Sequence, residues 1–260
     1  MKCNLPGKKK NTSMKYGRNA DPRLVEIVEN RDQYKIGLDD TFTFGCKMCG
    51  KCCTNREDIM LTPRDIFRMA KELQMSMQDF IQKYCESYIG PSSKFPVIRL
   101  FPEGEDKHCP LLKDRKCIVH QSKPVVCALF PIGRMFSAEQ GQEMSSQNMT
   151  YLLMHHGCGD GTEKHTVRDW LTTFNIPLED EFHIMWTNAL ADISKRLRDY
   201  LPKADEQEAF LLYNALFLGI YGSYHMESEF MPQFERNIKL AKELVEQITF
   251  KGGESGERRT

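Results

Sequence analysis

Apolar residues recur at short intervals in the first part of this chain and at helical spacing in the last part. Residues 41–44 alternate between polar and apolar and predict a strand, and residues 95–101 predict another, rich in β-favouring side chains. Between them, Thr62 and Ser76 are typical helix N-caps, each followed by apolar residues three and four positions apart. The first part is therefore expected to combine short strands with short helices.

The last part of the chain predicts long helices. Apolar residues recur at three- and four-residue spacing over 182–201 and again over 234–248, which indicates two amphipathic helices. Residues 210–221 are apolar on nearly every side, so we expect this helix at the centre of a bundle. The two patterns together predict an α+β fold, mainly α, in which a cysteine-rich part with short strands packs against a C-terminal helical bundle.

Shorter signals complete the predicted elements. Residues 109–120 have the pattern of a hairpin whose two apolar arms are joined by a polar tip. Pro131 limits residues 125–131 to a helical turn or a short extended piece. Thr166 and Asp169 have the spacing of a capping box and predict a helix start, and the acidic pair 179–180 is interpreted as charge at a helix N-terminus.

These patterns divide the chain into four parts. The N-terminal tail is basic, with Lys8, Lys9 and Lys10 among polar residues, and the last ten residues are rich in glycine and charge. The change from short elements to long helices falls near Gly161. The predicted parts are a disordered basic tail over 1–20, a cysteine-cluster domain over 21–161, a helical part over 162–250 and a disordered tail over 251–260.

Charge and hydropathy exclude two classes of partner. Lysine plus arginine and aspartate plus glutamate both number 36, so the formal net charge is zero. A nucleic-acid binder would need a basic face to neutralise phosphates. No apolar run approaches the roughly 20 residues that a membrane helix requires. The residues after Met1 lack the apolar segment of an export signal, so we expect a cytoplasmic protein without nucleic-acid or membrane partners.

Ten cysteines in a reducing compartment favour metal binding over disulfides. Four of them fall within eight residues around Gly50, which can adopt a positive φ because it has no Cβ. Four more stand beside predicted turns or strand ends. The tail residue Cys3 and the helical Cys85 are interpreted as small apolar side chains and left out of the site. The predicted metal ligands are Cys46, Cys49, Cys52, Cys53, Cys109, Cys117, Cys127 and Cys158.

Spacing favours an iron–sulfur cluster, with zinc as the alternative. Three thiols at two-residue intervals are typical of a 4Fe–4S ferredoxin, whose fourth ligand comes from elsewhere in the chain. Structural zinc more often uses two separated pairs of ligands. Cys52 and Cys53 are adjacent, and neighbouring side chains diverge in helices and strands. We therefore expect these two thiols to serve two sites, or one of them to support the metal without binding it.

No spacing in the chain assigns a catalytic residue, a dinucleotide fingerprint or a phosphate loop. The histidines near cysteines are interpreted as surface or hydrogen-bonded residues, with metal ligation as the alternative. These histidines are His108, His120, His155 and His156.

The ordered cysteine series resembles the CxxCxxCC zinc- or iron-chelating family of YkgJ-like cysteine-cluster proteins over roughly residues 44–158. The residues that carry the resemblance are Cys46-x-x-Cys49-x-x-Cys52-Cys53, Cys109-Pro110-Leu111, Cys117-Ile118, Lys123-Pro124-x-x-Cys127 and Phe130-Pro131. The resemblance implies a metal-chelating protein. One branch of the family is similar to flagellin lysine-N-methylases, which implies as an alternative an S-adenosylmethionine-dependent protein lysine methyltransferase that carries the cluster. A metal-delivery module is a third possibility, and the sequence identifies no protein partner for it.

Overall fold

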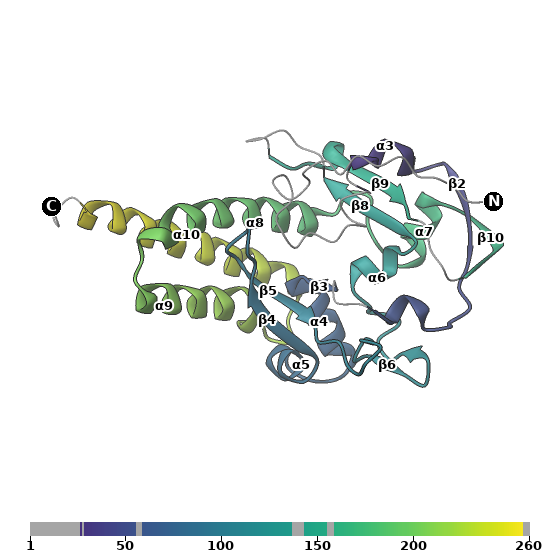
Figure 1. Ribbon diagram of the computed structural model, residues 1–260, viewed down its shortest axis with the longest axis horizontal. Coiled ribbons are helices and arrows are strands. Elements are labelled where there is room, and N and C mark those ends of the chain that lie inside the picture. The colour runs from purple at the N-terminus through teal and green to yellow at the C-terminus, as the bar shows by residue number, and fades with distance from the viewer. Residues whose placement is uncertain (1–26, 28, 56–58, 137–142, 155–158, 257–260) are drawn as a thin grey trace, which may run out of the picture.

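The computed structural model describes residues 27, 29–55, 59–136, 143–154 and 159–256, with side chains to residue 249. Short strands and helices form one end of the molecule, and the longer helices of the C-terminal part extend away from them (Figure 1). This arrangement confirms the predicted α+β class, mainly α. The helices are α3 (Arg31–Tyr34), α4 (Pro63–Glu72), α5 (Met77–Tyr84), α6 (Val125–Leu129), α7 (Val167–Thr173), α8 (Glu181–Tyr200), α9 (Glu206–Phe217) and α10 (Phe230–Gly256), with short turns η1 (Lys51–Cys53), η2 (Ser146–Asn148), η3 (Leu201–Lys203) and η4 (Leu218–Gly222).

The strands form small antiparallel sheets. The strands are β1 (Lys35–Ile36), β2 (Thr41–Gly45), β3 (Met60–Leu61), β4 (Cys85–Ile89), β5 (Pro96–Leu100), β6 (Leu112–Lys113), β7 (Lys116–Cys117), β8 (Ile132–Phe136), β9 (Met149–Leu153) and β10 (Asp160–Thr166). Their order is β1-β9-β8, β10-β2, β3-β5-β4 and β6-β7. The pairing of β10 with β2 sets Asp160 opposite Gly45, immediately before the first cysteine of the cluster.

Local capping places the short helices where the sequence predicts them. Thr62 and Asp65 form a capping box at the start of α4, and Ser76 accepts a hydrogen bond from the backbone of Asp79 at the start of α5. Thr166 caps α7 in the same way. Each cap satisfies backbone N–H groups that the first helical turn leaves unpaired. The predicted hairpin is present but smaller than expected, because β6 and β7 pair over only two residues each.

Two hydrophobic cores support these elements. The first joins α4, α5 and β3–β5 to α8, α9 and α10, so it combines residues from both sides of position 161. The second lies among β2, α6, β8, β9 and α7. Helix α6 borders both, since Cys127 packs against the first core while Ala128 and Leu129 belong to the second. The division into folding units near residue 161 stays a prediction.

The expected position of residues 210–221 is wrong. Helix α10 lies between α8 and α9 in Figure 1, and α9 is at the edge of the three. Phe210 is 67% exposed and Leu211 and Leu218 are each 58% exposed, whereas Leu212 and Leu216 are buried. An apolar composition on all sides does not determine which side finds a partner.

Over the described residues, no helix combines the length and the apolar character needed to cross a bilayer.

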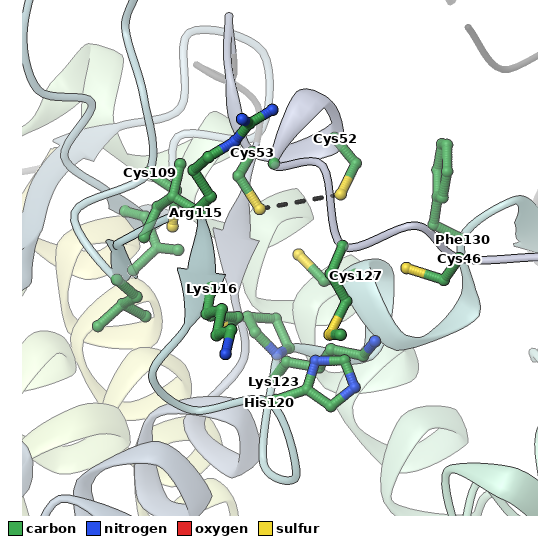
Figure 2. A pocket seen from close by; sticks show the side chains of 17 residues that line it. Cys46, Cys52, Cys53, Cys109, Arg115, Lys116, His120, Lys123, Cys127 and Phe130 are labelled. Atoms are coloured by element: carbon green, nitrogen blue, oxygen red, sulfur yellow. Dashed lines mark hydrogen bonds between the residues drawn. The ribbon is translucent and has the colours of Figure 1, made fainter. Parts of the chain in front are cut away.

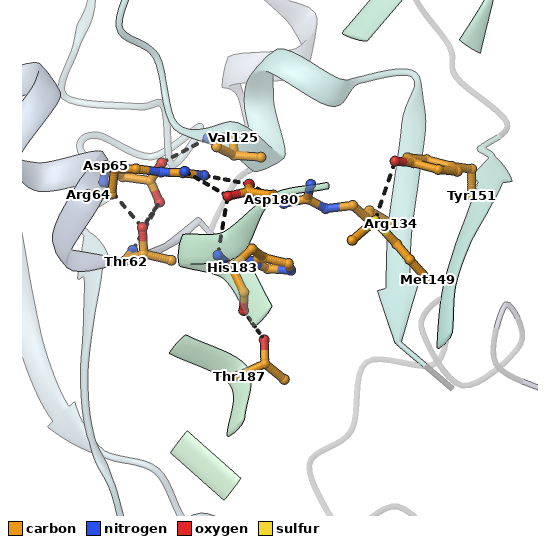
Figure 3. Close-up of polar contacts among 10 residues, drawn as sticks. All are labelled: Thr62, Arg64, Asp65, Val125, Arg134, Met149, Tyr151, Asp180, His183 and Thr187. Carbon is orange, nitrogen blue, oxygen red and sulfur yellow. Dashed lines mark hydrogen bonds and ion pairs between the residues drawn. The ribbon is translucent and has the colours of Figure 1, made fainter. Parts of the chain in front are cut away.

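A buried ion pair joins α4, β8 and α8 (Figure 3). Both terminal nitrogens of Arg64 donate to Asp180, at 2.7 and 2.6 Å, and Arg134 Nη2 donates to the same carboxylate at 3.4 Å. Asp180 also accepts from the backbone N–H of His183 at 3.2 Å and so caps α8. The interpretation of this acidic position as helix N-terminal charge therefore agrees with the structure.

Candidate metal centre

The first four cysteines follow strand β2 in a loop that ends in the turn η1. Gly50 has φ of +75°, as its position in the loop predicts, and Cys53 donates its backbone N–H to the Gly50 carbonyl at 2.9 Å. Met48 also adopts a positive φ, of 48°. These turns fold the loop back on itself, so its cysteines lie close together rather than along an extended strand.

Backbone contacts bring later cysteines to this loop. The N–H of Cys109 donates to the carbonyl of Cys53 at 2.8 Å, which links the two segments at the cysteines themselves. Pairing of β6 with β7 then sets Cys117 opposite Leu112. Asp65 positions α6 from the other side, because its carboxylate accepts the backbone N–H of Val125 at 3.0 Å. Helix α6 carries Cys127, so buried Asp65 connects the cap of α4 to the site.

Six of the eight predicted ligands line one cavity of about 340 Å³, which we call the thiol cavity. Figure 2 shows the thiols of Cys52, Cys53 and Cys127 turned toward one another, with Cys46 and Cys109 on either side of them. Apolar residues such as Leu111 and Phe130 form part of the remaining walls. The six cysteines are Cys46, Cys52, Cys53, Cys109, Cys117 and Cys127.

A smaller cavity of about 110 Å³ shares part of this lining. It adds Cys49 to Cys46, Cys52 and Cys127, so the three thiols at two-residue intervals and one distant thiol border the same space. Cys158 lies outside the described residues, and so do His155 and His156. The structure therefore brings seven of the predicted ligands to two adjoining cavities.

The thiols are near one another without forming a preassembled metal cage. Within the described ranges, no three histidine, cysteine or acidic side chains stand close enough to hold one ion. The Sγ atoms of Cys52 and Cys53 are 3.8 Å apart. The expected divergence of adjacent side chains therefore does not keep these two thiols apart, although both residues lie in the short turn η1. Whether the two thiols serve one site or two stays a prediction.

All eight described cysteines are free thiols, and burial favours the neutral form of Cys53, Cys85 and Cys117. A hydrogen bond with Cys52, burial and repulsion from neighbouring thiolates raise the pKa of the Cys53 thiol. Burial raises the pKa of Cys117 as well. A metal that binds here must therefore displace protons, and its binding energy offsets the cost of gathering negative thiolates in one cavity. Soft thiolates are the donor set that zinc and iron–sulfur clusters prefer.

Residues from the loop before α6 and from the α7 region complete the walls. Lys123 and His120 line both cavities, and Trp170 and Phe174 from the α7 region line the smaller one. Burial lowers the pKa of His120. Sequence reasoning missed Lys123 as a site residue, although it stands one helical turn before Cys127. It had no signal for Phe174, whose place depends on the packing of α7.

Of the residues left out of the predicted site, Cys85 and His108 lie outside both linings, and Cys3 lies outside the described residues. Cys85 pairs with Leu100 in the β4–β5 sheet and packs against the first core, and burial raises the pKa of its thiol. His108 is also outside the linings and makes a 2.8 Å contact with Asp106.

Comparison with known proteins gives one match. Residues 45–158 match a family model named CxxCxxCC, whose description is a putative zinc- or iron-chelating domain. No curated protein matches the chain. No solved structure matches it either. The matched segment contains every cysteine that lines the two cavities.

Proposed function

We propose, from the match of residues 45–158 to the model of a zinc- or iron-chelating domain, that this chain holds a thiolate-ligated metal centre in the thiol cavity and its smaller neighbour. The observation that carries the proposal is the convergence of six cysteines from separate segments of the chain on one cavity. A bound zinc ion would supply a rigid crosslink between these segments, whereas an iron–sulfur cluster would also exchange electrons.

An iron–sulfur cluster is the first candidate, held by Cys46, Cys49, Cys52 and Cys127. These four thiols border the smaller cavity together. Three of them have the spacing of a ferredoxin loop, and Cys127 is the distant fourth ligand that such a loop requires. In this assignment Cys53, together with Cys109 and Cys117 in the thiol cavity, surrounds the centre without binding the same cluster.

Zinc is the second candidate, favoured by one distance. Two thiolates on a tetrahedral zinc, each about 2.3 Å from the metal, lie about 3.8 Å apart. The Sγ atoms of Cys52 and Cys53 already have a separation of 3.8 Å. In this assignment both adjacent cysteines are ligands, and Cys109, whose backbone is bonded to Cys53, lies within the same cavity.

Metal analysis of the intact chain tests the proposal. The protein is purified without oxygen, its visible spectrum is recorded, and iron, sulfide and zinc are measured per chain. A brown protein with matching iron and sulfide supports the cluster, and a colourless protein with stoichiometric zinc supports the second candidate. A chain that carries neither metal, even after reconstitution under reducing conditions, would contradict the proposal.

Serine variants test the ligand assignment. Cys127→Ser should weaken metal binding by more than about 100-fold, because loss of a ligand costs more than the 10- to 100-fold typical of outer partners. Cys85→Ser is the matched control, since Cys85 is partly buried yet lines neither cavity. Chelator competition measures both. Equal losses in the two variants would mean that general destabilisation, not ligation, explains the effect.

Two further variants separate the candidates. The cluster assignment requires Cys49 and spares Cys53, so Cys49→Ser should lose the metal and Cys53→Ser should keep it. The zinc assignment predicts the reverse order, because its ligand pair is Cys52 and Cys53. Metal content per chain, measured on folded protein, gives the answer directly.

A further inference from the structure

Lys123 is a half-buried cation in the wall of both cavities. It lines the thiol cavity and the smaller cavity, in each case together with Cys46, Cys52 and Cys127. Figure 2 shows its side chain on the same side of the thiol cavity as His120. Burial lowers the pKa of its ammonium, and the thiols of Cys127 and Cys117 oppose this shift. The ammonium is therefore close enough to the cysteines of the cavity for their thiols to interact with it electrostatically.

The ammonium is held in place by packing. Its Nζ lies 4.1 Å from the centre of the Phe174 ring, a cation–π contact. Phe174 in turn packs edge-on against Trp170, at 5.5 Å between ring centres. An ammonium fixed in this way stays beside the cavity instead of extending into solvent, as a free lysine would.

The charges around the two cavities are one-sided. Among the described residues that line them, the charged side chains are Lys47, Arg115, Lys116 and Lys123, with no aspartate or glutamate. Arg115 and Lys116 are exposed, and the Lys47 side chain is 59% exposed and paired with Asp160, so solvent and counter-ions screen them. Nearby Glu72 is engaged by the backbone and hydroxyl of Ser122. Of these four cations, Lys123 is the one whose charge is least screened by solvent, because its side chain is half-buried.

A thiolate centre needs such a cation. Four thiolates on a divalent zinc leave a net charge of about −2, and burying an uncompensated charge is costly. We propose that Lys123 is the charge-compensating residue of this centre: its clamped ammonium offsets the negative charge of the metal-bound thiolates. The inference rests on the proposed metal centre. It assigns Lys123 a positioning and tuning role, not that of a ligand.

Charge and packing are separated by two substitutions. Lys123→Met keeps the length and apolar stem of the side chain but removes the charge, and it should weaken metal binding by about 10- to 100-fold, as outer partners of metal sites do. Lys123→Arg keeps the charge and the contact with Phe174, so its affinity should remain within about threefold of the parent. Lys116→Met, an exposed lysine on the same cavity, is the control and should change binding less than about twofold.

Affinity is measured by chelator competition on the metal-loaded full chain, with zinc or iron as the probe, and circular dichroism verifies the fold of each variant. In an iron–sulfur form, Lys123→Met should also lower the midpoint potential, because the reduced cluster loses a compensating cation. If Lys123→Met does not fold, Lys123→Gln carries the same expectation.

The outcomes are distinct from those of the proposed function. A parent chain that binds no metal contradicts the metal centre itself. A parent chain that binds metal and a Lys123→Met variant that binds it equally well overturn the inference about Lys123 alone. Equal losses in Lys123→Met and Lys123→Arg also overturn it, because they show that shape and not charge is required.

Discussion

Gly159 controls how closely the two strands beside the cysteine loop can approach. Its φ is +76°, and a Cβ built on it would lie 2.9 Å from the carbonyl of Gly45 and closer still to the ring of Phe44. Next to it, Asp160 pairs with Lys47 of the loop at 2.5 Å, and the Lys47 contact holds the pKa of Asp160 at about 2. A glycine is therefore required where β10 meets the start of the cluster.

Gly159→Ala should lower the free energy of unfolding by about 1–3 kcal/mol, since it combines a strained φ with a close approach to backbone. Gly161→Ala is the matched control two residues later. Its Cβ would meet Thr43 Oγ1 at 3.5 Å, an ordinary contact, and its φ is not positive, so we expect little change. Urea unfolding of both variants measures the difference. A similar loss at Gly161 would contradict the steric argument.

At the scale of elements, the Arg64–Asp180–Arg134 group joins parts of the molecule that different cores support. Asp180 is 1% exposed and the Arg134 side chain 3% exposed. Arg64 also stacks on Phe182 of α8, with its guanidinium carbon 4.3 Å from the ring centre. One carboxylate thus compensates two buried cations and caps a 20-residue helix.

Asp180→Asn should destabilise the protein by about 3–5 kcal/mol, because it leaves both guanidinium groups without their negative partner. Asp192→Asn lies on the same helix and removes an exposed pair with Arg196, at 3.2 Å. That control should cost no more than about 0.5 kcal/mol. Chemical denaturation of metal-free protein isolates the effect from metal binding. A small loss at Asp180 would mean that solvent reaches the buried arginines.

His183 links the same helix to β8 and predicts a pH dependence. Its ring stacks on Phe136 at 5.1 Å, and burial, with repulsion from Arg134, lowers its pKa to about 4. In the unfolded chain this histidine has an ordinary pKa of about 6.5, so between about pH 6.5 and pH 4 it is protonated in the unfolded state and neutral in the folded state. The free energy of unfolding therefore falls as the pH decreases from about 6.5 to about 4.

His183→Gln should flatten this part of the pH profile. The variant removes a contribution of order 3 kcal/mol between the two pH limits while keeping a neutral side chain of similar size. The measurement is the urea midpoint of metal-free protein at a series of pH values, with the parent chain as reference. Parallel profiles for parent and variant would show that His183 does not titrate as its burial predicts.

At the scale of the whole molecule, the two cysteine-lined cavities lie between two cores rather than within one. The first core packs against Cys109, Cys117 and Cys127, and the second surrounds Trp170, which lines the smaller cavity. The long helices bury their apolar faces within the first core, so they have a source of stability besides the metal. Metal removal should therefore loosen the junction more than the helices.

Chelation of the metal should lower the melting temperature while most helical signal is kept at room temperature. Metal at about 1,000 times its Kd stabilises the folded chain by about 4 kcal/mol, and chelation removes that contribution. The chain has two tryptophans, so single variants show where the change occurs. In a Trp186→Phe variant, the fluorescence of the remaining Trp170 should change on chelation. In a Trp170→Phe variant, the fluorescence of the remaining Trp186 should stay the same. Equal responses from both would contradict a local site.

Features that depend on a few neighbouring residues could be predicted from the sequence. The caps at Thr62 and Ser76, the positive φ of Gly50, the long amphipathic helices and the eight candidate thiols follow from spacing, because helix periodicity and backbone sterics act within one or two turns. The fold class followed from the same patterns.

Which of these features come into contact depends on the tertiary structure. The tertiary structure places Cys127 beside Cys46, Cys49 and Cys52 at the smaller cavity, and Lys123 on the ring of Phe174. It also brings the sulfurs of Cys52 and Cys53 into contact. Phe210 is exposed, on a helix that was expected at the centre of the bundle. These outcomes depend on contacts between segments far apart in the chain. The hydrophobic effect is non-directional, so a local pattern of apolar residues does not specify which distant segment will cover them.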